Sequence, residues 1–347
     1  MYFKKILLAI VLIGLVVAAY FAYYVYSAMF VPNTAFSNNE AYVYIESDAD
    51  YNKVRERLMP LLKDIKTFDA LAKRKKYVNN IKAGKYIIKK DMTNNDIINS
   101  IRSNNIPVKV SFNNQNSLEL LAGRIANQIE VDSLSLLNAF NDTVFLEETG
   151  FNEATALGMY IPNSYEFFWN TSAENFRKRM LTEYNKFWND SRLEKAKKAN
   201  LKPDEVIALA SIVQEESKQK SEQPRVAGVY INRLKNNWTL DADPTLKFAA
   251  YKLPKYKNTV IKRVLNVHKE INSPYNTYKN AGLPPGLIVM PDISAIDAVL
   301  NYEKHSYFFF VVDAKKPGYH KFSKTIAQHN QYAREYHRYL NQQGIRR

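Results

Sequence analysis

Two adjacent glutamates, Glu215 and Glu216, are the carboxylates whose setting in the sequence best suits acid–base chemistry. They end an apolar segment that begins at Pro203, and proline is favoured in the first turn of a helix. The segment contains no glycine and no further proline, so we expect one helix that carries both carboxylates at its C-terminal end.

Helical spacing separates the two carboxylates. A residue three or four positions after another lies on the same helix face, and Glu216 follows Val213 and Ile212 at those spacings. Glu215 instead follows Ser211 on a more polar side. Desolvation of a carboxylic acid raises its pKa, which suits a general acid near neutral pH. We therefore predict that Glu216 is catalytic and that Glu215 is a solvated surface residue.

The sequence excludes several other kinds of site. Its 347 residues include no cysteine, which removes thiol nucleophiles, disulfides and iron–sulfur clusters. No two of its 10 glycines stand two or five apart, so neither a dinucleotide-binding fingerprint nor a P-loop is present. Gly282 and Gly286 enclose no serine, which excludes a nucleophile elbow. His320 and His329 lack a matching set of carboxylate ligands, and we predict no metal and no cofactor.

Further motifs surround the helix in a fixed order. Residues 210–217 read ASIVQEES, residues 224–234 read PRVAGVYINRL, and residues 240–245 read LDADPT. They are followed by YNTY at 275–278 and GLPPG at 282–286. In this order the motifs resemble the YceG-like family of endolytic murein transglycosylases, the MltG type, and the resemblance covers nearly the whole chain after its N-terminal apolar segment.

The resemblance implies an enzyme that cuts the MurNAc–GlcNAc bond of nascent peptidoglycan strands and leaves 1,6-anhydroMurNAc ends, with a role as a terminase of glycan polymerisation. Glu216, retained before Ser217, matches the family's catalytic glutamate, whereas Gln214 stands where many members have Glu. Glu216 would protonate the glycosidic oxygen and then accept the proton of the muramyl C6 hydroxyl. One carboxylate suffices because the substrate supplies the nucleophile, whereas ordinary glycosidases use two.

Other residues of the motifs are candidates for substrate binding: Tyr275, Asn276, Thr277, Tyr278, Arg233 and Asp243. The 275–278 loop offers aromatic faces and polar tips to sugar rings, or is a well-packed loop. Arg233 would hold an acetamido or lactyl group, or brace the fold, and bracing is favoured for Asn232. No second acid has a local sequence that suggests a matching role. Asp241 and Asp243 are candidates only by their proximity to the motif, and a turn before Pro244 is the favoured role of Asp243.

The N-terminal segment from residue 6 to residue 31 is uncharged and apolar, long enough to cross a hydrocarbon core of about 30 Å. Lys4 and Lys5 precede it, so the positive-inside rule predicts a cytoplasmic N-terminus at 1–5. Because the segment exceeds the roughly 7–15 apolar residues of a signal peptide, we predict an uncleaved, single-pass anchor in the inner (cytoplasmic) membrane, with the bulk of the chain periplasmic.

The helices and strands expected from the sequence, which must position these residues, indicate an α+β fold. We expect three parts after the transmembrane helix. Residues 38–110 read as a small α/β module, which the resemblance implies is LysM-like. Residues 111–192 are expected to be a mostly helical connecting part, and residues 193–347 a larger mixed α+β catalytic domain. In the small module we expect a strand at 43–45, a helix at 51–71, a turn into a strand at 81–88, and a helix capped by Thr93.

The net charge of +15 calls for an anionic partner. No helix-turn-helix, RRM or zinc-finger pattern accompanies the basic runs, so we predict no nucleic acid. The expected partners are peptidoglycan glycan strands and the cytoplasmic membrane, and peptidoglycan synthases or division proteins stay open. Three alternatives also stay open: a lysozyme-type muramidase that adds water, a non-catalytic peptidoglycan-binding scaffold in which Glu216 is structural, and a nucleic-acid binder if the chain is cytoplasmic.

Overall fold

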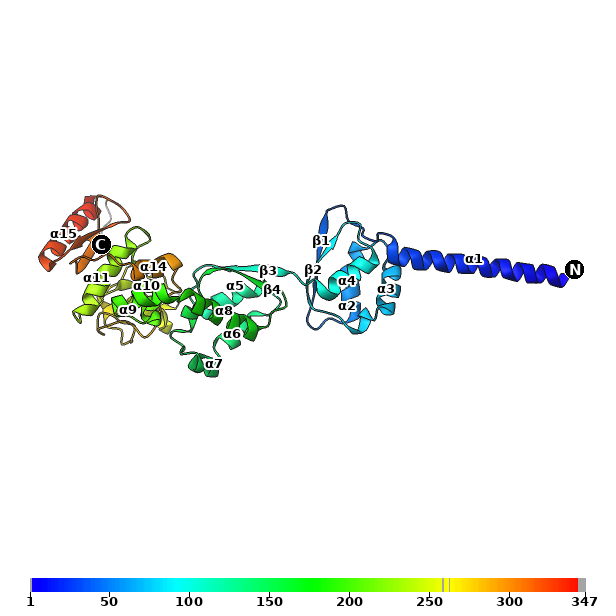
Figure 1. Cartoon of the computed structure of the whole chain (residues 1–347). Helices are drawn as coiled ribbons and strands as arrows, with labels where there is room; N and C mark the ends of the chain where they lie inside the picture. The colour runs from blue at the N-terminus through cyan, green and yellow to red at the C-terminus, as the bar shows by residue number, and fades with distance from the viewer. Residues whose placement is uncertain (1, 258, 262, 343–347) are drawn as a thin grey trace. The chain divides into compact units, whose positions relative to one another are not determined.

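The computed structural model describes residues 2–257, 259–261 and 263–342, and the chain divides into two compact units. Unit 1 comprises Met1–Val110, Ala126–Val131 and Tyr165–Ser172, and unit 2 comprises Ser111–Ile125, Asp132–Ser164 and Ala173–Arg347. The division passes through both strands of a two-stranded ribbon, β3 (Pro107–Phe112) and β4 (Asn163–Phe168). Figure 1 shows the order of the elements along the chain.

Unit 1 begins with the apolar helix α1 (Tyr2–Phe30), drawn in blue in Figure 1. Its 29 residues, at a rise of about 1.5 Å each, exceed the roughly 30 Å of a hydrocarbon core. It begins four residues before the segment that the sequence predicts and ends one residue earlier. The helix is long and apolar enough to cross a membrane, a property that signal sequences share.

The rest of unit 1 is a small α/β module. Strands β1 (Glu40–Ile45) and β2 (Gly84–Lys89) pair antiparallel, with Glu40 opposite Lys89 and Ile45 opposite Gly84. Val43 and Ile45 point into the core, whereas Tyr42 and Tyr44 are exposed, as strand alternation requires. Three helices complete this core: α2 (Tyr51–Leu58), α3 (Ile65–Arg74) and α4 (Asn94–Ser103).

The expected single helix at 51–71 is wrong, because the structure has two helices there. α2 ends at Leu58, and a 3₁₀ turn that contains Pro60 follows. Proline lacks the backbone N–H that an α-helix needs and clashes with the preceding turn. Asp64 then caps α3 by accepting from the backbone N–H groups of Lys66 and Thr67. The expected cap at Thr93 is confirmed, in a capping box with Asp96.

Buried amides fasten the C-terminal end of α1 to this module. The Asn94 Nδ2 atom donates to the Ala28 carbonyl at 3.1 Å, and Asn33 Nδ2 donates to Asn94 Oδ1 at 2.6 Å. Asn33 also accepts from the backbone N–H of Asp64 at 2.8 Å. One of the carbonyls that a helix end leaves unpaired is thereby satisfied inside the protein.

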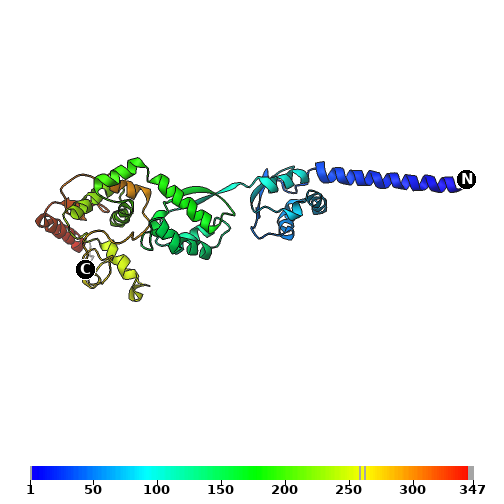
Figure 2. The same cartoon turned by 60° about the horizontal axis from the view of Figure 1, so that its bottom comes forward.

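Unit 2, as far as it is described, is mostly helical, with one complete strand pair and the adjoining ends of β3 and β4. Its described helices are α5 (Leu118–Ala126), α6 (Ser133–Phe140), α7 (Thr143–Glu148), α8 (Ala173–Phe187), α9 (Asp190–Ala199), α10 (Pro203–Glu216), α11 (Gln223–Lys235), α12 (Asp243–Tyr251), α13 (Asn266–Lys269), α14 (Ile293–Leu300) and α15 (Ile326–Gln342). Strand β4 lies inside the stretch expected to be mostly helical. Strands β5 (Phe309–Val312) and β6 (His320–Ser323) form an antiparallel hairpin. Helix α15, drawn in red, packs on this hairpin (Figures 1 and 2).

Helix α10 is the central element of unit 2. It packs against α9, α11, α12 and α14 and is buried from Val206 to Gln214. Ser211, which the spacing places on a polar side, is therefore fully buried, and its hydroxyl donates to the Ala208 carbonyl at 2.7 Å. The expectation that this side of the helix is polar is therefore wrong for the middle of the helix, because neighbouring helices cover that side. The expectation is correct only near the end of the helix, at Glu215, which is exposed.

Candidate active site

Glu216 is the last residue of α10, and its carboxyl group faces α11. The Tyr230 hydroxyl donates to Glu216 Oε1 at 2.8 Å. Burial, with a smaller contribution from the negative charge of Asp243, raises the pKa of Glu216 to about 7. The Tyr230 hydrogen bond and the charges of His320 and Lys247 act in the opposite direction. The residue is partly exposed, although protein surrounds its carboxyl group, so the acid is desolvated and still reachable.

Glu215 differs sharply from its neighbour. Its side chain is exposed and forms an ion pair with Lys218 at 2.7 Å. The expectation of a solvated surface residue is confirmed for Glu215. The Glu216 carboxyl group, with its pKa of about 7, is able both to give and to take a proton near neutral pH.

Asp243 brings a second carboxylate close to the acid. It is the first residue of α12, where the helix dipole favours a negative charge, and Pro244 follows it. The Tyr278 hydroxyl donates to Asp243 Oδ1 at 2.7 Å. Burial, this hydrogen bond and the Asp243 charge raise the pKa of Tyr278, so the tyrosine stays a hydrogen-bond donor.

Asn276 and Thr277 are buried, and their side chains bond to protein. Asn276 Nδ2 donates to the carbonyls of Lys269 and Ile271, each at 2.8 Å. Thr277 Oγ1 accepts from the backbone N–H of Ala242 at 3.0 Å. These bonds fix the loop against the start of α12 and so place the carboxylate that begins this helix.

Tyr275 lies at the edge of a cavity of about 570 Å³. Its ring packs on Phe248, with ring centroids 4.6 Å apart, and Lys252 Nζ lies 5.7 Å from its centroid. A second cavity, of about 440 Å³, is lined by Glu215, Phe248 and Lys252 among others. The aromatic and cationic side chains therefore border open space next to the end of α10.

Arg233 and Asn232 brace α11. Arg233 Nε donates to the Phe308 carbonyl and Nη1 to the Leu240 carbonyl, both at 2.8 Å. Asn232 Nδ2 donates to the His305 carbonyl at 2.9 Å. Arg233 is buried, so its guanidinium group serves mainly to join three segments of unit 2.

Sequence reasoning does not single out a buried pair beside the acid, Glu222 and His320. Glu222 Oε1 accepts from the His320 backbone N–H at 2.8 Å, and its Oε2 lies 2.7 Å from His320 Nδ1. Ser217 Oγ donates to the same carboxylate at 3.1 Å. Burial acts to raise the pKa of Glu222, but these hydrogen bonds hold it below its usual value. The pair, 98 residues apart, is linked through Ser217 to the end of α10.

Tyr230 also has no separate signal in the sequence beyond its place in the PRVAGVYINRL motif. Gly228 on the same helix lets α11 pack closely, because a Cβ atom there would lie 2.4 Å from the Glu303 carbonyl oxygen. The Tyr230 ring then meets Phe310 of β5 edge-on, with centroids 5.9 Å apart. These contacts aim the Tyr230 hydroxyl at Glu216.

The fold and the site together define a class of protein: a mixed α+β chain in which one desolvated carboxyl group, that of Glu216, is able to exchange a proton near neutral pH. Within residues 2–257, 259–261 and 263–342, no three His, Asp or Glu side chains gather as metal ligands would. The chain belongs to the YceG-like family, whose family model matches residues 43–335.

Named relatives agree with this assignment. The chain is 29% identical to an endolytic murein transglycosylase of Bacillus subtilis over 293 residues, which cover 80% of this chain and 78% of the relative. It is 25% identical to the endolytic murein transglycosylase of Streptococcus pneumoniae strain D39, over 71% of this chain and 49% of the relative, so it spans about half of that protein. A crystal structure of a yceG-like protein, lmo1499, from Listeria monocytogenes shares the fold, with a TM-score of 0.55, 24% identity, and coverage of 85% of this chain and 99% of that one.

Proposed function

We propose that this protein is an endolytic murein transglycosylase that cleaves the MurNAc–GlcNAc bond of peptidoglycan and leaves 1,6-anhydroMurNAc ends. Family membership and the names of the Bacillus and Streptococcus relatives support the substrate and the reaction class. The observation that carries the proposal is the Glu216 carboxyl group, whose pKa of about 7 lets it exchange a proton near neutral pH.

Glu216 acts first as an acid and then as a base. Tyr230 occupies Oε1, so the proton resides on Oε2 and passes to the glycosidic oxygen as the bond to the muramyl anomeric carbon breaks. The ionised Glu216 then takes the proton of the muramyl C6 hydroxyl while that oxygen closes on the anomeric carbon. The acid is regenerated, and no water is consumed.

Asp243 and Tyr278 complete the reacting side of the site. The transition state of glycosidic cleavage is oxocarbenium-like, and a nearby carboxylate stabilises its positive charge. Asp243 is exposed and close enough to influence the Glu216 pKa. Tyr275 offers an aromatic face to a sugar ring, while Asn276, Thr277 and Arg233 act by holding the loops that bind the substrate.

A second candidate function, a lysozyme-type muramidase, draws support from the same Asp243. An exposed carboxylate near the acid is a group that could activate water, and two carboxylates are what a hydrolase needs. The lytic reaction is favoured because Tyr278 already donates to Asp243 Oδ1 at 2.7 Å, so that this oxygen has a partner within the protein.

The chemistry of the product ends tests the proposal. Purified full-length protein is incubated with murein, and the released strands are analysed by mass spectrometry. We expect anhydromuramyl ends, which lack one water relative to hydrolysed ends. Reducing muramyl ends without anhydro ends would establish the muramidase instead, and binding without cleavage would establish the scaffold.

The remaining proposals concern location. We propose that α1 is an uncleaved inner-membrane anchor that leaves the rest of the chain periplasmic, and that the module at residues 38–110 is LysM-like. Anchoring near the site of synthesis suits a terminase that cuts nascent strands and meets peptidoglycan synthases or division proteins. Protease accessibility in spheroplasts tests this topology: we expect the exterior part to be digested in intact spheroplasts, and a protected chain would contradict it.

A further inference from the structure

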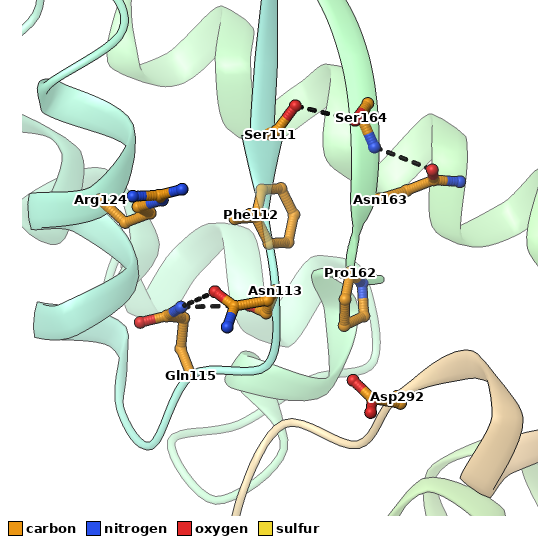
Figure 3. Close-up of a pocket in the computed structure, with 9 residues that line it drawn as sticks. All are labelled: Ser111, Phe112, Asn113, Gln115, Arg124, Pro162, Asn163, Ser164 and Asp292. Carbon is orange, nitrogen blue, oxygen red and sulfur yellow. Dashed lines mark hydrogen bonds between the residues drawn. The ribbon is translucent and has the colours of Figure 1, made fainter.

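A polar cavity of about 770 Å³ lies in unit 2, apart from the acid and its hydrogen-bond partners (Figure 3). It is formed where strand β3 ends and strand β4 begins, beside helix α5 and the residue that precedes α14. The side chains that matter here are Ser111, Asn113, Gln115, Arg124, Ser164 and Asp292.

The polar groups of this cavity are ordered by bonds among themselves. Ser111 Oγ and Ser164 Oγ lie 2.8 Å apart across the ribbon, and Gln115 Nε2 donates to Asn113 Oδ1 at 2.9 Å. Figure 3 shows the Arg124 side chain, carried by α5, on one side of the cavity and the Asp292 carboxyl group at its lower end.

Amides, hydroxyls and one guanidinium group fit a particular kind of ligand. Amide and hydroxyl side chains both donate and accept hydrogen bonds, as the acetamido and hydroxyl groups of an N-acetylated sugar require. Pro162, which is half-buried, adds apolar surface on which a sugar ring is able to rest, whereas Phe112 is buried. Arg124 brings a positive charge to the cavity, and a guanidinium group is able to donate hydrogen bonds to a carboxylate.

Hydrogen bonds from the backbone of residues 290 and 292 connect the cavity with helix α10. Gln214 Oε1 accepts from the Asp292 backbone N–H at 2.6 Å, and the Gln115 carbonyl accepts from the Met290 N–H at 3.0 Å. Gln214 precedes Glu216 by two residues, which is about 3 Å along the helix axis. The end of α10 therefore carries the acid and also holds the backbone of Asp292, one of the residues that line the cavity.

We propose that this cavity is a second binding site for the glycan strand, which takes a carboxylate-bearing, N-acetylated sugar remote from the cleaved bond, with Arg124 as the partner of the carboxylate. The proposal rests on the proposed function, because a strand cut internally extends beyond the scissile bond. According to this proposal, the cavity contributes to the binding of long strands and does not take part in the chemical step.

Arg124→Ala tests the proposal in the full-length protein. On long, size-fractionated glycan strands we expect KM to rise about tenfold with kcat unchanged, as loss of one charge-assisted hydrogen bond would give. On the shortest strands that are still cleaved we expect no change. Lys178→Ala, which removes the same charge from an exposed position of α8, is the matched control and should leave both values unchanged. An equal KM change on both lengths, or none on long strands, overturns the inference.

Two further measurements keep the inference separate from the cleavage reaction. Glu216→Gln protein, with and without Arg124→Ala, is titrated with long strands, and we expect the protein that also carries Arg124→Ala to bind more weakly. This difference in affinity should disappear when the strand carboxylates are amidated. If wild-type protein binds strands but never cleaves them, the proposed function fails while this titration still decides the cavity. Asn113→Asp, at an exposed position, places a negative charge in the cavity and should also weaken binding if Arg124→Ala unfolds the protein. Unchanged binding in that variant would contradict the proposal.

Discussion

The two units differ in whether buried ionisable groups accompany their buried amides. In unit 1, neutral amides of Asn33 and Asn94 are hydrogen-bonded at the end of α1. Unit 2 also buries neutral amides, such as that of Asn276, but around α10 it encloses the ionisable groups of Glu216 and Glu222 as well. An amide keeps one charge state at every physiological pH, whereas a carboxyl group with a raised pKa changes state near neutrality. The buried amides therefore hold geometry, and the buried carboxyl groups are where chemistry and pH dependence are expected.

The largest test of this contrast is Glu216→Gln. Loss of a general acid should lower kcat on purified murein about 100- to 10,000-fold, because glutamine has no proton to give. Glu215→Gln is the matched control, since it changes the exposed neighbour on the same helix, and it should leave kcat unchanged. Strand cleavage is measured by release of anhydromuramyl ends. Full activity in Glu216→Gln, with the control also active, would remove Glu216 from the mechanism.

Glu222→Gln tests whether the second carboxylate stabilises the fold. Breaking its buried pair with His320 should lower the free energy of unfolding by about 3 kcal/mol at neutral pH. The pKa of Glu222 is held below its usual value of 4.5, so its contribution is present above that pH and is lost as pH falls through the folded pKa.

The difference between wild-type and Glu222→Gln protein in thermal unfolding should therefore shrink in acid. Lys321, next to His320, bonds to Glu335 near the surface, and Glu335→Gln is a comparable ion-pair control with little expected effect. A difference that stays constant down to acid pH would mean that the charge of Glu222 does not matter.

Asn94→Ala tests the amides of unit 1. It removes the donor to the Ala28 carbonyl and the acceptor of Asn33, which should destabilise unit 1 by about 2 kcal/mol. Asn99→Ala, on an exposed position of the same helix, should cost much less. The kcat of the folded protein on soluble strands should be unchanged by either variant. A fall in kcat for Asn94→Ala would break the contrast, because a geometric amide of unit 1 would then affect the chemistry.

Tyr230→Phe should have the smallest effect, a shift in pH dependence. Its hydroxyl lowers the pKa of Glu216, so removing it raises that pKa, and Glu216 stays protonated to higher pH. The alkaline fall of kcat/KM, near pH 7 in the wild type, should move upward by about one pH unit. The phenyl ring keeps the contact with Phe310. Tyr275→Phe is the control, and a downward shift in Tyr230→Phe would contradict the assignment.

Part of the fold follows from local sequence. The helix that begins at Pro203, its last residues Glu215 and Glu216, and the cap at Thr93 were all predictable from spacing, capping and charge preferences. Pro60 is an equally local signal, because a proline inside a helical pattern ends or kinks the helix, here within residues 51–71. The complete burial of Ser211 is different, because it depends on which helices pack around α10.

The sequence by itself determined the apolar N-terminal helix, the order of the motifs and the different exposure of Glu215 and Glu216, since each depends on residues within a few turns of one another. Tertiary structure alone decided which groups surround that acid. Tyr230 reaches Glu216 from 14 residues away, Tyr278 reaches Asp243 from 35, and His320 reaches Glu222 from 98. A carboxyl pKa depends on desolvation and on charges nearby in space, and packing between separate helices brings these together at distances that no local pattern encodes.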